Sequence, residues 1–187
     1  MAAPTLRADA ARNLELILEA ADEAFAELGH DASVADIAAR AGVGQATIFR
    51  RFETKDDLIA AVFERKLQQM VESTETAARK RTAWDGLMSF MTNVTEMQLR
   101  DRGFFQSIAE QLMEREGVAE LKLRVKAAMA DLVERAKAEG DLREDITSED
   151  VFAFCCAAAS AAGAVPTPRA AKRYLSVITD GMRAPSA

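Results

Sequence analysis

The sequence feature that most constrains the fold is the stretch SVADIAARAGVGQATIFRRF at residues 33–52, whose pattern predicts two short helices joined by a glycine corner. The stretch opens on a serine, and Asp36 follows three residues later. This is the spacing of a capping box, which satisfies the first backbone N–H groups of a helix. Gly42 can end that helix in a left-handed conformation at little steric cost. With a second helix from about Gly44 to Phe52, the stretch has the form of a helix-turn-helix.

The predicted second helix has one apolar side and one side that mixes polar, basic and aromatic residues. Ile48 and Phe52 lie four residues apart on the apolar side and can pack against the first helix, together with Val43 of the corner. An exposed aromatic ring among arginines is unusual on a solvated face, but it suits a helix that enters the major groove of DNA. There Gln can bind adenine, Arg can bind guanine or phosphate, and an apolar group can contact the methyl of thymine. The groove-facing side and its flanks carry Gln45, Ala46, Thr47, Phe49, Arg50 and Arg51.

Composition favours an all-helical protein with enough apolar residues for a substantial core. The 187 residues are 49% hydrophobic, with only four prolines and one tyrosine, and alanine, leucine, glutamate and arginine dominate. The net charge of −6 argues against non-specific coating of nucleic acid. A specific DNA-binding protein needs only a local positive patch, however, and Arg50, Arg51 and Lys55 form one on the groove-facing side.

With the helix before it and the FETKDDL that follows, this part of the chain resembles the N-terminal domain of the TetR family of transcriptional repressors. The resemblance covers roughly residues 10–70. It rests on the motifs Asp36-Ile37-Ala38, Ala41-Gly42-Val43 and Thr47-Ile48-Phe49, followed by Phe52 and Lys55. It implies a DNA-binding function and assigns the contact with DNA to Ser33, Val34, Gly44, Gln45, Ala46, Thr47, Phe49, Arg50, Arg51 and Lys55.

Three residues depart from the family pattern. Phe49 stands where the family often has tyrosine, so a hydroxyl that would contact phosphate is missing. Arg51 replaces a frequent histidine, which should strengthen a phosphate contact, and Gly44 replaces a common serine, so the second helix lacks a side-chain cap. Given the resemblance, we expect Lys55 to bind a DNA phosphate, because a docked anion would offset the unfavourable placement of a cation in the first turn of a helix.

The whole chain is predicted to be all-α, with about nine helices in two parts. Residues 1–11 are expected to form a flexible arm, which either is disordered or approaches DNA. Residues 12–55 are expected to form the DNA-binding domain. Residues 56–187 are expected to form a larger helical domain for effector binding and dimerisation.

Apolar residues at helical spacing place the longer helices. One is expected over residues 12–28, and another over 55–79 that joins the DNA-binding domain to the rest. Gly103 and Gly117 should separate a sixth helix, over residues 104–113, from its neighbours.

Large aromatic and methionine side chains are concentrated in the second half of the chain. One interpretation is a pocket for a small apolar effector, because such side chains line adaptable binding sites. The other is ordinary core, which is the commoner role for any single residue of this kind. The candidate pocket residues are Trp84, Met91, Phe104, Phe105, Met113 and Met129.

The last two helices are expected over about 148–163 and 169–183. Small residues at 157–162 would let another helix approach closely. The resemblance implies that these two helices pair with those of a second copy to form a homodimer. A dimer is needed because each subunit reads one half-site of a palindromic operator.

The chain offers little support for catalysis or metal binding. It lacks a nucleophile elbow, a phosphate-binding loop, an HExxH motif and a Cys/His cluster. Its one histidine, His30, follows a glycine and is taken as a loop residue. Cys155 and Cys156 point about 100° apart on a helix, which is poor geometry for a disulfide. We expect both cysteines to be buried, with a thiol sensor as the alternative, and we expect no metal and no cofactor.

These features lead to a hypothesis for function. The chain is expected to be a ligand-responsive repressor that binds double-stranded operator DNA as a homodimer, with a small apolar effector that shifts the dimer away from its DNA-binding state. The alternative is an all-α small-molecule carrier or enzyme without a DNA function. No apolar run reaches membrane-spanning length and no signal peptide opens the chain, so we expect a cytoplasmic protein without a membrane partner.

Overall fold

The computed structural model is all-α, as predicted, and describes residues 3–100, 104, 108, 111–112, 115–165, 167 and 169–185. Eight α-helices and no strand occur in these ranges, against about nine helices expected. They are α1 (Ala3–Leu28), α2 (Val34–Ala41), α3 (Gln45–Phe49), α4 (Lys55–Ala78), α5 (Ala83–Arg100), α7 (Glu116–Ala138), α8 (Ser148–Ala164) and α9 (Ala170–Met182), with a short 3-10 helix η1 (Gly29–Asp31) after α1. The expected sixth helix lies largely outside the described residues.

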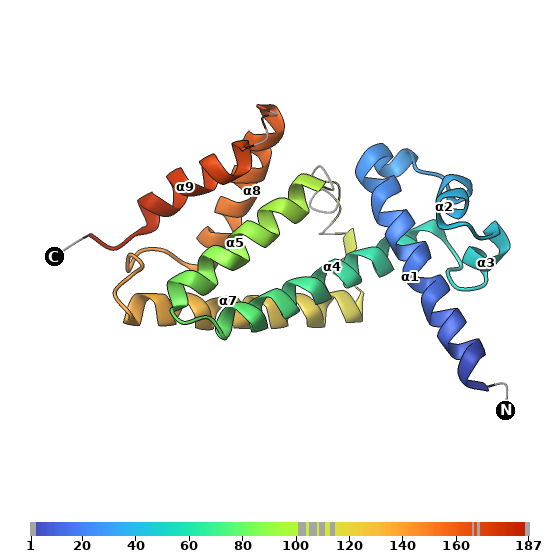
Figure 1. Cartoon of the computed structure of the whole chain (residues 1–187), viewed down its shortest axis with the longest axis horizontal. Coiled ribbons are helices and arrows are strands. Elements are labelled where there is room, and N and C mark those ends of the chain that lie inside the picture. Colours follow the sequence, from blue (N-terminus) through green and yellow to red (C-terminus); the bar gives the residue numbers. More distant parts are fainter. Residues whose placement is uncertain are drawn as a thin grey trace.

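The helices form a small N-terminal unit and a larger C-terminal unit, joined by α4. Helices α1, α2 and α3 gather at one end of the molecule (Figure 1). From there α4 extends into the larger unit, where it packs along α7 and against α5, while α8 packs against α5 and α9. The termini lie at opposite ends of the view. Because α4 also contacts α1, it is the element through which the two units are connected.

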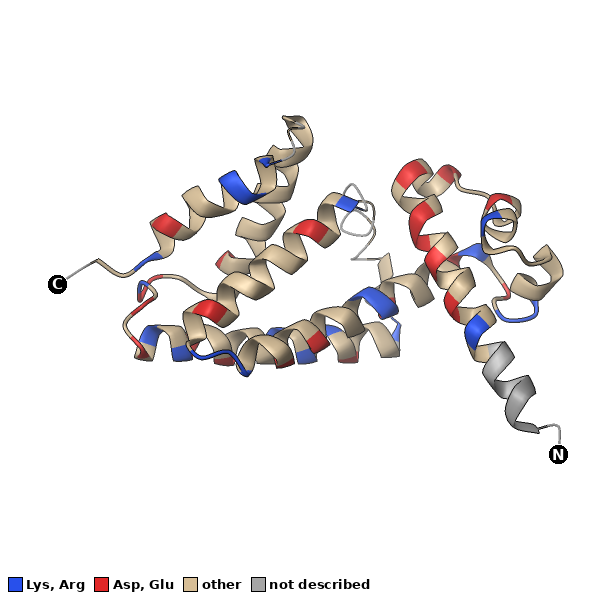
Figure 2. Cartoon of the chain, in the orientation of Figure 1, with Lys and Arg blue, Asp and Glu red and all other residues tan. Residues whose placement is uncertain are grey.

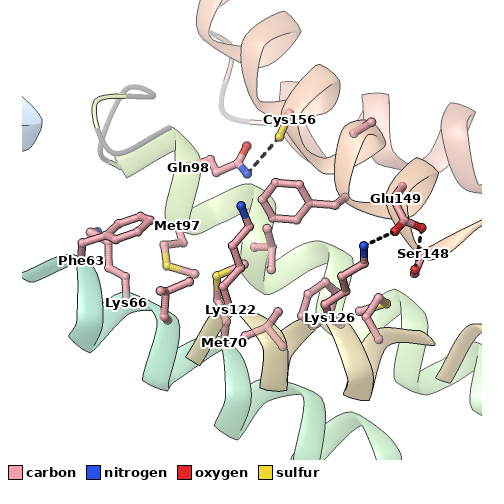
Figure 3. Close-up of a pocket in the computed structure, with 17 residues that line it drawn as sticks. Phe63, Lys66, Met70, Met97, Gln98, Lys122, Lys126, Ser148, Glu149 and Cys156 are labelled. Atoms are coloured by element: carbon pink, nitrogen blue, oxygen red, sulfur yellow. Dashed lines mark hydrogen bonds and ion pairs between the residues drawn. The ribbon is translucent and has the colours of Figure 1, made fainter. Parts of the chain in front are cut away.

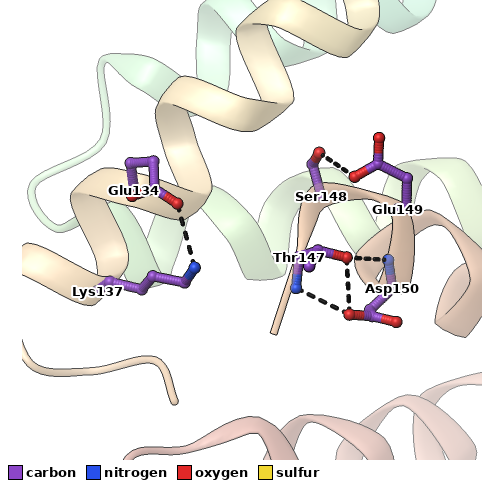
Figure 4. Close-up of polar contacts among 6 residues, drawn as sticks. All are labelled: Glu134, Lys137, Thr147, Ser148, Glu149 and Asp150. Carbon is purple, nitrogen blue, oxygen red and sulfur yellow. Dashed lines mark hydrogen bonds and ion pairs between the residues drawn. The ribbon is translucent and has the colours of Figure 1, made fainter. Parts of the chain in front are cut away.

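Three helices begin with capping boxes, at Ser33, Thr54 and Thr147, and in the sequence each of these residues stands three positions before an aspartate. Thr54 shows the arrangement: its hydroxyl accepts the backbone N–H of Asp57 at 3.1 Å, and the Asp57 carboxylate accepts the backbone N–H of Thr54 at 3.0 Å. The box at Ser33 opens α2, and the box at Thr147 opens α8 (Figure 4). In each, the hydroxyl also donates to the carboxylate, and this bond is the largest cause of a lowered pKa of the aspartate. These local bonds fix where α2, α4 and α8 start.

Two boundaries in the N-terminal unit differ from expectation. Helix α1 begins at Ala3, so residues 3–11, which we predicted to be a flexible arm, continue the helix instead. Helix α3 is shorter than predicted and ends at Phe49 rather than Phe52. Beyond it, Arg51 and Phe52 both donate their backbone N–H to the carbonyl of Ile48 at 2.9 Å, which closes a tight turn in place of further helix.

Gly117 does not break the chain, contrary to expectation. It lies in the first turn of α7, next to the Glu64 carboxylate of α4. A Cβ at this position would lie 3.1 Å from the Glu64 Oε1 atom, which is the end of a flexible side chain. The glycine is therefore a helical residue here and does not end a helix.

One apolar core runs through both units. In the N-terminal unit Phe25, Ile37 and Leu58 are fully buried, and in the larger unit Leu87 and Leu132 are buried in the same connected cluster. Burial of such side chains is the main source of stability. In the described ranges, no helix has the length and apolar character needed to cross a bilayer.

Candidate functional site

The glycine corner has the geometry that the sequence predicts. Gly42 ends α2 with φ 67° and ψ 28°, which is the left-handed conformation. The backbone N–H of Val43 then donates to the carbonyl of Ala38 at 3.0 Å, which closes the end of the helix. Gly44 returns to an extended conformation, and α3 starts at the next residue without a side-chain cap, also as expected.

Helix α3 presents the predicted residues to solvent. Ile48 and Phe52 are 1% and 8% exposed, so the apolar side is packed against the rest of the unit. Phe49 is 50% exposed, which is a high value for a phenylalanine. Gln45, Ala46, Arg50 and Arg51 are exposed with it, and Thr47 is half-buried. At the neighbouring positions, Ser33 and Gly44 are exposed and Val34 is half-buried. The aromatic and polar side chains are thus free to meet a partner, and they are not used as core.

Several of these side chains hold one another in place. The Arg50 guanidinium donates to the Thr47 hydroxyl at 3.1 Å, which fixes it along α3. The Ser33 hydroxyl is engaged in the capping box of α2. The Lys55 ammonium, which we expected to contact phosphate, donates to the carbonyl of His30 in η1 instead. In the chain without DNA, Lys55 therefore ties the start of α4 to the end of α1.

Charge is distributed unevenly around this unit. Figure 2 shows basic residues in the turn between α3 and α4, which holds Arg50 and Arg51, and acidic residues along α1. The positive patch is local, although the chain as a whole is acidic.

Several ion pairs involving α4 join the N-terminal unit to the larger one, among them Arg65 with Glu15 of α1 at 3.4 Å and the two pairs that follow. The Asp57 carboxylate, already bonded within its capping box, accepts a hydrogen bond from Arg115 at 3.0 Å, at the start of α7. The Lys66 ammonium on α4 lies 2.7 Å from the Asp22 carboxylate on α1. The Lys66 side chain is only 8% exposed, so this pair lies at the buried contact between α1 and α4.

The larger unit contains a cavity of about 600 Å³ between α4, α5, α7 and α8. This volume is within the range of small-molecule sites. Most of the lining is apolar. The lining residues are Phe63, Lys66, Leu67, Met70, Phe90, Val94, Met97, Gln98, Lys122, Val125, Lys126, Met129, Ser148, Glu149, Phe152, Ala153 and Cys156.

Of the six residues proposed for a pocket, the cavity includes Met129. Trp84 packs elsewhere, with the Arg183 guanidinium 4.0 Å above its ring, and Met91 is 1% exposed and belongs to the core. Phe104 stacks on Phe25 of α1 with ring centroids 5.5 Å apart. For Trp84 and Met91 the interpretation as core was therefore the better one. The remaining two, Phe105 and Met113, lie outside the described residues.

Sequence reasoning missed most of the lining because these residues look like ordinary helix faces. One signal was available: Lys66 lies three residues after Phe63 and four before Met70, in the apolar stripe of α4. A lysine on a buried face needs a partner or an opening. Here its ammonium has Asp22 as a partner, and its stem lines the cavity.

The polar groups of the cavity come from all four of the helices that line it (Figure 3). Gln98 of α5 donates its amide N–H to the sulfur of Cys156 on α8 at 3.3 Å. Lys126 of α7 lies 2.8 Å from the carboxylate of Glu149 on α8. Hydrogen bonds from Lys126 and then Ser148 lower the pKa of Glu149 to about 2, so it remains ionised.

The two cysteines differ more than expected. Cys155 is fully buried, and burial raises the pKa of its thiol to about 12, which leaves it unreactive. Cys156 is only half-buried and faces the cavity. In the ranges that the structure describes, no cluster of His, Cys, Asp and Glu is suited to a metal ion.

The last two helices, α8 and α9, pack against each other and leave apolar residues in solvent. Val177 of α9 is 68% exposed, and Val165, directly after α8, is 45% exposed. Phe152 of α8 is 41% exposed but lines the cavity. Single exposed apolar residues are common, and the two valines are apolar side chains outside the cavity that a partner could cover.

Comparison with known proteins covers both units. Residues 17–62 match the family model described as bacterial regulatory proteins of the tetR family. Residues 82–184 match a second model, described as the C-terminal domain of SbtR-like transcriptional regulators. The second match alone spans more than half of the chain.

Individual relatives agree with the family models. The chain is 29% identical over 137 residues to the fatty acid metabolism regulator protein of Bacillus subtilis, covering 72% of this chain and 69% of that protein. It is 25% identical over 184 residues to the HTH-type transcriptional repressor KstR2 of Rhodococcus jostii, covering 90% of each. The crystal structure of a TetR transcription regulatory protein from Mycobacterium vanbaalenii aligns with a TM-score of 0.72 and 28% identity, over 95% of this chain and 99% of that one.

Proposed function

Because the chain belongs to the TetR family of transcriptional regulators, we propose that it is a ligand-responsive repressor that binds a palindromic operator as a homodimer. The observation that carries this proposal is the α3 surface, which leaves Gln45, Phe49 and Arg50 in solvent beside a glycine corner of the predicted geometry. The alternative of a carrier or enzyme without a DNA function gives no reason for this exposed aromatic and basic surface.

In the proposed complex, α3 lies in the major groove and the surrounding groups hold the phosphates. Gln45, Thr47 and Phe49 face the base edges, where an amide, a hydroxyl and an apolar ring can discriminate between base pairs. Arg51 and the capped start of α2 contact the backbone. Lys55 joins them when a phosphate replaces the His30 carbonyl as the partner of its ammonium.

The homodimer is proposed to form through α8 and α9, whose exposed apolar residues would then be covered. Each subunit brings one α3 to one half-site, so the two helices must lie about 34 Å apart to enter successive major grooves. We place the regulator in the cytoplasm, where its DNA target is found, and assign it no catalytic role.

The cavity is proposed to be the effector site. Its walls include α4, which carries the DNA-binding unit at its other end, so a ligand that moves α4 changes the spacing of the two α3 helices. The Lys66–Asp22 and Arg115–Asp57 pairs transmit such a movement to the start of α4 and to α1. Binding lowers operator affinity only if the ligand prefers the state with the wrong spacing.

Selection of bound fragments from a random DNA pool tests the proposal and returns the half-site at the same time. We expect a palindrome, with binding that weakens steeply as salt rises because phosphate contacts release counterions. Thr47→Ala and Arg51→Ala should weaken binding while the helical content and the dimer stay intact. A flat salt response, or no effect of either substitution, would contradict the proposal.

A further inference from the structure

The charges around the cavity are not balanced. Three lysines and one glutamate line it. Among the described residues, Lys66 pairs with Asp22 and Lys126 with Glu149, whereas Lys122 has no ion-pair partner. Figure 3 shows Lys122 extending from α7 across the cavity toward the amide of Gln98. One positive charge without an ion-pair partner among those residues therefore lies at the edge of a largely apolar cavity, on a side chain that is exposed to solvent.

The amide of Gln98 is also incompletely bonded. Its nitrogen donates to Cys156, but its oxygen is buried and has no hydrogen-bond partner among the described residues. A buried polar atom without a partner lowers stability, so the packing around this amide does not satisfy it fully.

The nitrogen of the same amide makes the site complementary to an anion. It carries two hydrogens and donates one of them to Cys156. Figure 3 draws this nitrogen, rather than the oxygen, on the side of the amide toward the Lys122 ammonium. Two donors from α5 and α7, one of them charged, suit the two oxygens of a carboxylate.

We propose that the cavity takes an amphipathic carboxylate, with its head bound by Lys122 and Gln98 and its hydrocarbon chain among the apolar side chains of α4, α5 and α7. This inference rests on the proposed role of the cavity as the effector site and names the class of ligand. A purely apolar ligand would strip water from Lys122 and from the free N–H of the Gln98 amide without replacing those contacts, so it binds less well than an acid of the same chain length.

The apolar part of the lining is suited to a chain rather than to a rigid ring. Methionines at positions 70, 97 and 129 are flexible and adapt to the shape of a bound group. Phe63 and Phe90 line the same space. The acid head stays near Lys122 and Lys126, which are exposed, and the chain enters the space behind them.

Calorimetric titration of the purified full-length chain without DNA tests the proposal. Sodium dodecanoate, 1-dodecanol and dodecanoyl-coenzyme A are compared, because they share a chain and differ in the head. We expect dodecanoate to bind at least about tenfold more tightly than dodecanol. Lys122→Met should remove this preference, Lys122→Arg should retain most of it, and Lys80→Met, an exposed lysine after α4, should leave it unchanged.

The outcomes separate the ligand class from the regulatory function. Equal affinity for acid and alcohol, or a preference that survives Lys122→Met, overturns the proposal and leaves the effector role of the cavity standing. Stronger binding of the coenzyme A ester, lost in Lys122→Met, overturns the carboxylate assignment in favour of a phosphate-bearing head. A third outcome is that dodecanoate binds as expected while the affinity for the operator is unchanged in the presence of saturating dodecanoate. That result would support the carboxylate ligand class and contradict the role of the cavity as effector site.

Discussion

The DNA-binding corner and the cavity are built in opposite ways. In the corner, Ser33 bonds to Asp36 across a separation of three residues, and a single glycine conformation sets the angle between the helices. In the cavity, Gln98 meets Cys156 across a separation of 58 residues. Four helices contribute to the lining of the cavity, whereas the corner is contained within one short stretch.

This difference indicates which of the two regions tolerates amino-acid substitutions. The corner depends on one backbone conformation and a few hydrogen bonds, so a single substitution can disrupt it. The cavity depends on many apolar side chains, most of which also belong to the core, so no single apolar residue defines it. We expect a single substitution in the corner to disrupt its structure. We expect a single conservative substitution in the apolar cavity lining to change the ligand affinity only slightly.

Gly42→Val should have the largest effect on stability, about 2 kcal/mol, because a β-branched residue is strained in the left-handed conformation. Chemical denaturation monitored by circular dichroism measures it. The control is a substitution at Gly44, whose φ of −76° is accessible to any residue and whose Cβ would meet nothing within 4 Å. An equal loss at both positions would show that the corner is not set by the Gly42 conformation.

Ala153→Trp should fill the cavity and weaken binding of a neutral apolar probe such as Nile red at least about tenfold, or about 1.4 kcal/mol. Ala153 lines the cavity, whereas Ala127 is exposed on α7 and does not. Ala127→Trp is therefore the matched control. Fluorescence titration distinguishes the two variants, and equal binding by both would mean that the probe occupies another surface.

Arg51→Ala should lower operator affinity by about 1 kcal/mol, similarly for all sequences, and reduce the salt slope by about one unit, as expected for one phosphate contact. Arg79→Ala, at the far end of α4, is the control. Fluorescence anisotropy at several salt concentrations gives both quantities. If the loss depends on sequence instead, Arg51 contacts a base and the division of roles around α3 must be revised.

Gly44→Ser should have the smallest effect, a gain of about 0.3 kcal/mol, because it supplies the side-chain cap that α3 lacks. Thermal unfolding of the variant and the parent chain, side by side, measures the gain. A loss of stability would mean that the serine hydroxyl does not reach the backbone N–H groups of α3, and that the start of this helix has a different geometry.

The sequence was sufficient for the corner because the decisive interactions there are local. The caps at Ser33 and Thr54, the glycine at 42 and the burial of Ile48 all follow from spacing within a few residues. The same reasoning misplaced the start of α1, because the boundary of an exposed helix end is weakly determined by sequence.

The sequence was insufficient for the cavity because an apolar helix face looks the same whether it meets another helix or an empty space. Met91 and Met129 have the same chemistry and are both buried in the core, yet only Met129 of α7 also lines the cavity. The residues that could have indicated the cavity were polar residues within apolar helix faces, such as Lys66 in an apolar stripe and Gln98 on a largely buried helix.

Asp57 belongs to both units, since one carboxylate caps α4 and also binds Arg115. A substitution at position 57 removes the cap and the connection together, whereas a substitution at position 115 removes the connection alone. Substitutions at position 115 can therefore change the coupling between the two units without loss of the cap that stabilises α4. In a lineage that acquires a new effector, this position is where we expect compensating changes to accumulate first.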